Sequence, residues 1–160
     1  MKALAPTDLA FFDTAPLRIT ASARIDASPE RVFAAFADPV GWTRWFPRMY
    51  AAAWTTPTIA AVGAERLVKL SLYGHFLEKM IAWAPGQRLA FTMIATTSPL
   101  ARRLAEDYQL VDNGDGTTTL NWVFASEPNL LGKLATPVLT RLMQRMFRDA
   151  GAGLNRYLAL

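Results

Sequence analysis

Two glutamates, Glu78 and Glu106, stand in segments whose apolar and polar residues alternate. Successive side chains of a strand point to opposite faces, so Glu78 would share a face with Phe76 and Met80. A carboxylate between such neighbours is costly unless it is paired, hydrogen-bonded or protonated, and desolvation raises its pKa. We therefore expect one or both carboxyl groups to hydrogen-bond a polar group of a ligand, or to act as general acid or base on a bound carbonyl.

The same alternation places two aromatic residues beside Glu106. Tyr108 follows on its face of one segment, and Trp122 would lie across the strand pair. A polar spot on an apolar wall is typical of a site that orients an apolar ligand through a few polar contacts. The alternative is that Tyr108 and Trp122 are ordinary core residues whose OH and NH groups are satisfied.

A structural role is also the alternative for both carboxyl groups. Each could pair at a strand end with Arg66, Arg88 or Arg103, and neither would then meet a ligand. Both faces of the strand expected at residues 75–84 contain apolar residues, so either face could point inward. If the face of His75 and Leu77 points inward, Glu78 lies on the surface.

The composition excludes several kinds of site. There is no cysteine, which excludes disulfides, thiolate metal sites and cysteine nucleophiles, and His75 is the only histidine. We therefore assign no catalytic residue, no metal site and no cofactor, and expect His75, which follows Gly74 at a turn, on the surface. Hydrophobic residues make up 52% of the chain, and a net charge of +4 without a basic run indicates no nucleic-acid partner.

One domain is expected behind a short N-terminal segment. We expect residues 1–16 to be a lead-in with a helical turn at 7–12, and residues 17–160 to be a single ligand-binding domain. The N-terminus lacks the unbroken apolar stretch of a signal peptide, and no apolar run is long enough to span a membrane. We therefore expect a cytoplasmic protein.

Seven strands are expected, joined by hairpins and therefore antiparallel. Turn residues separate the alternating segments, and the sequence DNGDG is the strongest hairpin signal in the chain. The expected strands are residues 17–27, 48–56, 64–72, 75–84, 87–97, 101–112 and 116–126.

Three helices are expected. Residues 28–38 and 39–45 are short helices that start at Ser-Pro and Asp-Pro, and residues 129–158 form a long one. Pro137 could interrupt the long helix, whose main part would then restart with Thr136 as its cap. Its expected apolar face consists of Val138, Leu139, Leu142, Met143, Met146, Phe147 and Ala150.

The second short helix carries an aromatic cluster. Trp42 and Trp45 lie three residues apart and share a face, and Phe46 follows directly. We expect the cluster to pack into the sheet, with Trp45 or Phe46 lining a cavity. The face of the long helix opposite its apolar residues carries Arg141, Arg145 and Arg148. We expect this face to be solvated; alternatively, it docks on anionic lipid headgroups.

The order of these elements resembles the START-like superfamily (SRPBCC), in particular its polyketide cyclase/dehydrase and lipid-transport branch, over residues 17–158. The resemblance implies an α+β helix-grip fold, in which a curved seven-stranded antiparallel sheet wraps a long C-terminal helix and two short helices follow the first strand. It is carried by the segments IDASPERVFAAFADPVGWTRWFP, VGAERLVKL, FLEKMIAWAPGQRLAF and YQLVDNGDGTTTLNWVF.

The resemblance also implies an elongated apolar cavity between sheet and helix. Similar proteins bind lipids, sterols, polyketides, hormones or aromatic intermediates, and some are cyclases or dehydrases. We therefore expect a carrier or sensor of a hydrophobic small molecule rather than an enzyme. The alternative is a cyclase or dehydrase acting on a polyketide-like substrate through Glu78, Glu106 and Tyr108; a third possibility is a chaperone cofactor or membrane-associated stress protein.

The expected ligand-binding residues combine the inward faces of the strands with the apolar face of the long helix. A transient membrane contact is a further expectation, and the oligomeric state is left open. The expected ligand-binding residues are Trp45, Phe76, Glu78, Met80, Glu106, Tyr108, Trp122, Phe124, Leu139, Met143 and Phe147.

Overall fold

The structure is a computed structural model that describes residues 1–57 and 59–160. The helices and strands expected between residues 17 and 158 are present in the expected order. The strands are β1 (Lys2–Ala3), β2 (Leu17–Ile25), β3 (Met49–Trp54), β4 (Glu65–Leu70), β5 (Gly74–Ala84), β6 (Arg88–Thr96), β7 (Ala101–Asp112) and β8 (Thr118–Pro128). The helices are α1 (Phe11–Thr14), α2 (Pro29–Ala37), α3 (Pro39–Trp45) and α4 (Leu130–Leu158).

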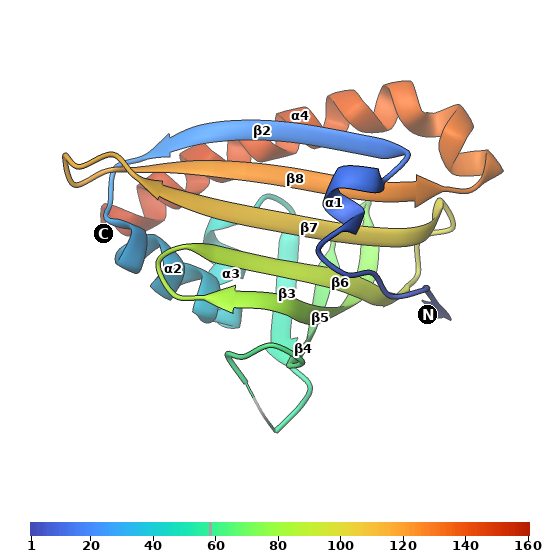
Figure 1. The fold of residues 1–160 in the computed structure, drawn as a ribbon, viewed down its shortest axis with the longest axis horizontal. Coiled ribbons are helices and arrows are strands. Elements are labelled where there is room, and N and C mark those ends of the chain that lie inside the picture. The colour runs from blue at the N-terminus through green and yellow to red at the C-terminus, as the bar shows by residue number, and fades with distance from the viewer. Residues whose placement is uncertain (58) are drawn as a thin grey trace.

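The strands that the described residues form belong to one antiparallel sheet. Its order is β2-β8-β7-β6-β5-β4-β3, and β1 adds a short pairing to β6. Because β2 and β3 lie at opposite edges, α2 and α3, which connect them, cross one end of the sheet (Figure 1). The curved sheet holds α4 against its inner face, which confirms the α+β class and the predicted helix-grip arrangement. The alternation of residues did not predict β1.

The long helix α4 is continuous. The side chain of Asn129 caps its start by accepting a hydrogen bond of 3.0 Å from the N–H of Gly132. The predicted restart at Thr136 is wrong, because α4 runs through Pro137 without a break. Pro137 lies on the exposed side of the helix, where water can reach the carbonyl group that loses its partner.

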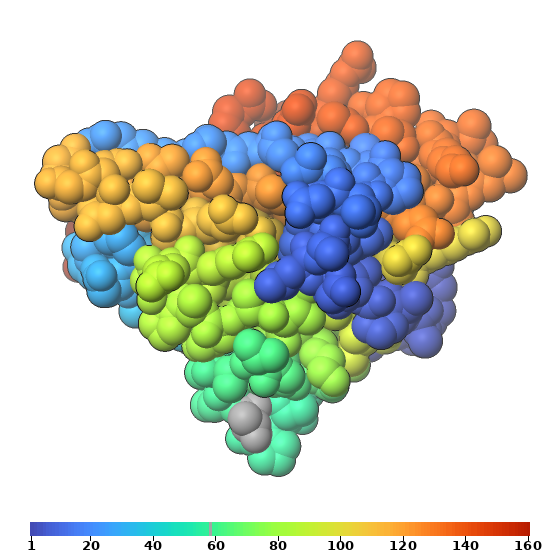
Figure 2. All heavy atoms as spheres, viewed as in Figure 1, coloured from blue at the N-terminus to red at the C-terminus, as the bar shows by residue number. Residues whose placement is uncertain are grey.

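The N-terminal lead-in covers the outer face of the sheet. Phe11 and Phe12 are buried there against three alanines of the sheet, Ala90, Ala105 and Ala125. Figure 2 shows the lead-in crossing the strands on this face. The strands beneath it are therefore buried on both sides, which removes the strict alternation that a half-buried sheet would have.

The two halves of α4 differ in what covers them. The second half packs on the sheet through buried residues such as Met146, Phe147 and Leu154. The first half stands clear of the strands at the upper right of Figure 1. Val138 and Leu142, which the sequence placed on the apolar face, are therefore 61% and 45% exposed.

Two glycines let the second half of α4 approach its neighbours closely. A Cβ atom at Gly153 would overlap the carbonyl oxygen of Trp45, so α4 and α3 touch backbone to backbone. A Cβ atom at Gly151 would lie 2.9 Å from that of Ala23 on β2. The Gly153 contact fixes α3, and the aromatic residues it carries, against α4, and the Gly151 contact does the same for β2.

Gly153→Ala is expected to lower the free energy of unfolding by about 1–3 kcal/mol, because the overlap with Trp45 outweighs the gain of about 1 kcal/mol in helix propensity. Urea denaturation followed by tryptophan fluorescence measures the change. Ala152→Leu at the exposed neighbouring position is the control, with an expected change within about 0.5 kcal/mol. Equal stability of Gly153→Ala and the wild type would contradict the close helix contact.

Candidate functional site

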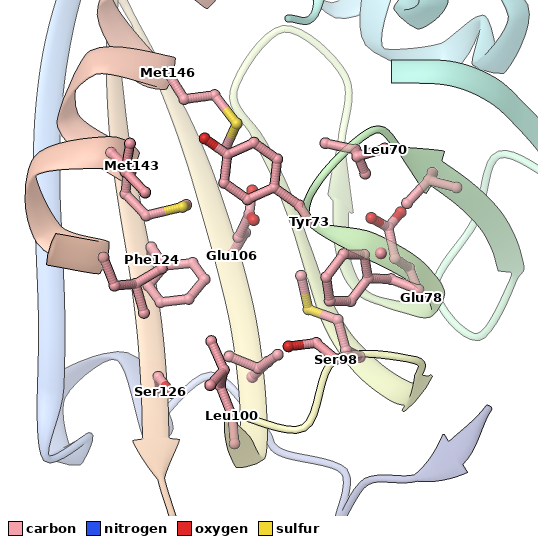
Figure 3. Close-up of a pocket in the computed structure, with 18 of the residues that line it drawn as sticks. Leu70, Tyr73, Glu78, Ser98, Leu100, Glu106, Phe124, Ser126, Met143 and Met146 are labelled. Atoms are coloured by element: carbon pink, nitrogen blue, oxygen red, sulfur yellow. The ribbon is translucent and has the colours of Figure 1, made fainter. Parts of the chain in front are cut away.

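A pocket of about 510 Å³ lies between the inner face of the sheet and α4. Most of its lining is apolar, and Figure 3 shows Glu78, Glu106 and Met143 projecting toward it from β5, β7 and α4. The predicted ligand-binding residues that line this pocket are Phe76, Glu78, Glu106, Tyr108, Phe124, Leu139 and Met143.

The pocket has a closed end and a mouth. At the closed end, next to α3, the lining residues are almost inaccessible to solvent; they are Trp42, Glu78, Phe91, Glu106 and Tyr108. The mouth lies where the β4–β5 turn, the β6–β7 turn and α4 meet. Its lining residues include the exposed Leu72, Pro99 and Leu142.

Four of the predicted ligand-binding residues, Trp45, Met80, Trp122 and Phe147, are buried but do not line the pocket. The rings of Trp122 and Phe147 pack against each other, so they fill the space between β8 and α4. Met80 is buried opposite its strand partner Phe91.

Trp45 stands behind the residues of α3 that reach the pocket. Trp42 and Phe46 line it instead, since they lie four residues apart and share the inward face of the helix. The ring of Trp45 packs against Phe36 and Trp42. Of the two alternatives in the sequence, Trp45 or Phe46, the structure places Phe46 on the pocket wall.

Strand β6 supplies lining residues that the sequence did not indicate. Phe91 and Met93 face the pocket from the middle of the sheet. Both faces of β6 are apolar because the lead-in covers its outer side, so alternation alone could not assign its parity. The sequence indicates only that Phe91 and Met93 share a face of the strand, because they lie two residues apart.

Glu106 is the polar centre of the closed end. Its Oε2 atom accepts a hydrogen bond of 2.7 Å from the Tyr108 hydroxyl and one of 3.1 Å from Trp122 Nε1. Tyr108 and Trp122 are directly opposite each other on β7 and β8, which brings both donors to one oxygen. Among the described residues no hydrogen bond reaches Oε1, so this oxygen is free to meet another molecule.

The surroundings of Glu106 favour its neutral form. Desolvation by burial raises the pKa of Glu106 to about 7, and the nearby Glu78 carboxyl adds to this, while the hydrogen bonds from Tyr108 and Trp122 oppose it. Burial and the Glu106 charge together raise the pKa of Tyr108 well above its ordinary value. Glu106 can therefore donate a hydrogen bond below about pH 7 and accept one above it.

Glu78 is held by an ion pair. Its Oε2 atom accepts a hydrogen bond of 2.8 Å from Arg66 Nε, and Arg66 Nη2 lies 2.7 Å away. The guanidinium also stacks over the Trp42 ring, 4.3 Å from its centre. Burial raises the pKa of Glu78, although the Arg66 charge opposes the shift.

The other two candidate arginines pair elsewhere. Arg88 contacts Asp107 with two hydrogen bonds of 2.8 Å, and Arg103 contacts Glu127. Glu78 therefore has the structural role considered for both glutamates, in which the carboxylate pairs with an arginine. Glu106 has no arginine partner among the described residues.

The remaining polar groups do not extend the site. His75 pairs at the surface with the Tyr50 hydroxyl, 2.8 Å from its Nε2 atom. In the described part of the chain, no three His, Asp or Glu side chains gather as a metal site would require. Nor do the described residues include a helix both long enough and apolar enough to cross a membrane.

A family model described as polyketide cyclase/dehydrase and lipid transport matches residues 16–159. The chain belongs to this family. An uncharacterized protein of Mycobacterium tuberculosis is similar to it, with 29% identity over 151 residues that are 93% of this chain and 89% of the mycobacterial one.

Solved structures share the fold of this family member. A START superfamily protein from Mycobacterium smegmatis superposes with a TM-score of 0.74 at 12% identity, over 89% of this chain and 97% of that chain. The di-domain ARO/CYC protein BexL gives a TM-score of 0.73 at 15% identity, over 90% of this chain and 47% of BexL. At these identities the likeness concerns the fold.

Glu106→Gln in this family member is expected to remove a pH-dependent loss of stability. Because the folded-state pKa lies above the ordinary value of 4.5, the wild type loses stability relative to the variant as the pH rises from about 4.5 to about 7, by on the order of 3 kcal/mol. Urea denaturation at several pH values measures this difference. Glu30→Gln, at an exposed position, is the control and keeps the wild-type profile; a constant difference between Glu106→Gln and the wild type would contradict the shift.

Proposed function

We propose that this protein binds a hydrophobic small molecule with one polar group, such as a lipid, polyketide or aromatic metabolite, as a cytoplasmic carrier or sensor. The apolar ring system or chain lies between sheet and α4, and the polar group meets Glu106. The observation that carries the proposal is the Oε1 atom of Glu106, which accepts no hydrogen bond from the described residues and lies at the closed end of a mostly apolar pocket.

The shape and lining of the pocket support this proposal. A volume of about 510 Å³ falls within the range of small-molecule sites, which are mostly apolar with a few placed polar groups. Met143 and Met146 line it from α4, and the unbranched methionine side chain adapts to ligands of different outline. Family membership supports the same class of ligand.

The position of Glu106 supports one orientation of the ligand. Tyr108 and Trp122 hold Oε2, so the carboxyl cannot turn away from the pocket without losing both hydrogen bonds. The neutral carboxyl donates to a carbonyl oxygen of the ligand, and the ionised form accepts from a hydroxyl group. A carbonyl-bearing ligand is therefore held best below about pH 7.

A cyclase or dehydrase is the second candidate, because Glu106 lines the pocket and could act on a bound substrate as general acid or base. A carboxyl group with a pKa of about 7 is suited to move a proton at neutral pH. Exchange of the α-protons of a naphthyl β-keto ester in deuterated water tests this role. An enzyme accelerates the exchange and Glu106→Gln abolishes it while the ester still binds, whereas a carrier leaves the exchange rate unchanged.

The neutral probe prodan, a naphthalene with one ketone group, is expected to bind the wild-type pocket and to quench tryptophan fluorescence by energy transfer. If the protonated Glu106 donates to the ketone, the apparent Kd rises about tenfold from about pH 6 to about pH 8, because the competent fraction falls. Glu106→Gln keeps the affinity but loses the pH dependence, since its amide donates at every pH.

A bulky residue inside the pocket is the matched test of location. Ser126 lines the pocket and Ser22 is exposed on β2, so Ser126→Trp is expected to weaken prodan binding at least tenfold while Ser22→Trp leaves it unchanged. Equal binding by both variants would contradict the proposal, as would a wild-type affinity that does not change with pH.

A further inference from the structure

The first half of α4 presents an apolar stripe to solvent. Leu130, Leu134 and Val138 follow one another at helical spacing and are 75%, 76% and 61% exposed. Leu131 beside them is exposed as well. A cluster of this kind at the surface indicates an interaction site, because isolated exposed leucines are common but contiguous ones are not.

Basic residues continue the same stripe. Arg141 and Arg145, which were expected on the face opposite Val138, follow it by three and seven residues and therefore lie on its side of the helix, and Lys133 precedes them. The sequence has no acidic residue from 128 to 148. Among the described residues, Lys133 and Arg141 have no side-chain hydrogen bond or ion pair, and Arg145 contacts Asp149 only at 3.8 Å. The stripe therefore matches a surface that is both apolar and negatively charged.

A further exposed leucine, Leu72, lies at the mouth on a different segment. Leu72 in the β4–β5 turn is 86% exposed and adopts a φ of +73°, a conformation that favours glycine or asparagine. The fold gains nothing from a leucine there, because its side chain is not buried and its backbone is strained. Leu72 and Leu142 both line the pocket and both are exposed, so apolar side chains from two segments flank the mouth.

We propose that the first half of α4 and Leu72 dock this protein on an anionic lipid bilayer, with the pocket mouth facing the membrane. Leucine side chains enter the interface between headgroups and acyl chains, and the basic residues meet the lipid phosphates. The proposal of membrane docking depends only on these exposed residues. The further proposal that the ligand enters from the bilayer through the mouth also depends on the proposed function.

Flotation with phosphatidylcholine–phosphatidylglycerol vesicles tests the proposal. The wild type is expected to float with these vesicles at low salt, to bind phosphatidylcholine vesicles at least tenfold more weakly, and to be released at high salt. The variant with Leu130, Leu131 and Leu134 changed to glutamine is expected to bind anionic vesicles at least tenfold more weakly. Val62→Gln with Val111→Gln, at exposed positions away from α4, is the control and binds as the wild type does.

Leu72→Asn separates docking from folding. Asparagine tolerates the positive φ, so this variant is expected to be more stable to urea than the wild type and yet to bind anionic vesicles several-fold more weakly. A structural role for Leu72 would predict lower stability and unchanged vesicle binding.

Three results would overturn the proposal. The first is equal binding of anionic and zwitterionic vesicles, and the second is vesicle binding by the triple glutamine variant equal to that of the wild type. The third is a wild-type dimer in light scattering that becomes monomeric in the triple variant without any vesicle binding, since the stripe would then cover a second copy. Prodan binding by the triple variant remains unchanged when only docking is lost, because its substituted residues do not line the pocket.

Discussion

The buried ion pair between Arg66 and Glu78 is the interaction on which the closed end of the pocket depends. The two residues are directly opposite each other on β4 and β5, so their contact holds the register of these strands. Arg66 in turn lies over the rings of Trp42 and Phe91, which joins α3 and β6 to the pair. Loss of either partner would leave an unpaired buried charge, at a cost of about 3–5 kcal/mol in proteins generally.

That pairing gives the two carboxyl groups of the pocket different roles. Arg66 pairs with Glu78 and makes it part of the scaffold, whereas Glu106 accepts hydrogen bonds, among the described residues, only from the neutral donors Tyr108 and Trp122. Glu106 also bears the repulsion of the Glu78 carboxyl, which adds to the effect of burial on its pKa. A proton therefore binds Glu106 near neutral pH, at its Oε1 atom, which accepts no hydrogen bond from the described residues.

The spacing of apolar residues along the chain predicted the helices and strands well. The predictions that failed concern contacts between segments that are distant in the sequence. Strand alternation placed Glu106, Tyr108 and Phe124 on one wall correctly, because β7 and β8 pair without a register shift over that stretch. Arg66, rather than Arg88 or Arg103, pairs with Glu78 because it lies directly opposite on the neighbouring strand. The register of the two strands could not be predicted from the sequence. Trp45 lies behind the pocket wall, at the point where the backbone of α3 touches Gly153 of α4, and this contact between distant segments is visible only in three dimensions.

Apolar side chains at the mouth of the pocket, such as Leu72 and Leu142, are exposed rather than packed in the core. The first half of α4 stands clear of the strands there, so helical periodicity identified an apolar face without showing whether protein or solvent would cover it. An apolar interior with one polar contact at its closed end, and apolar side chains around its opening, is suited to a molecule that is mostly hydrophobic.

A crystal structure of the protein with prodan tests the central claim most directly. The account predicts the naphthalene ring between Phe124 and Met143 on one side and Phe76 on the other, with the ketone oxygen within hydrogen-bond distance of Glu106 Oε1. A probe bound outside the pocket, or one whose ketone points to the mouth while Oε1 stays unpartnered, would contradict it.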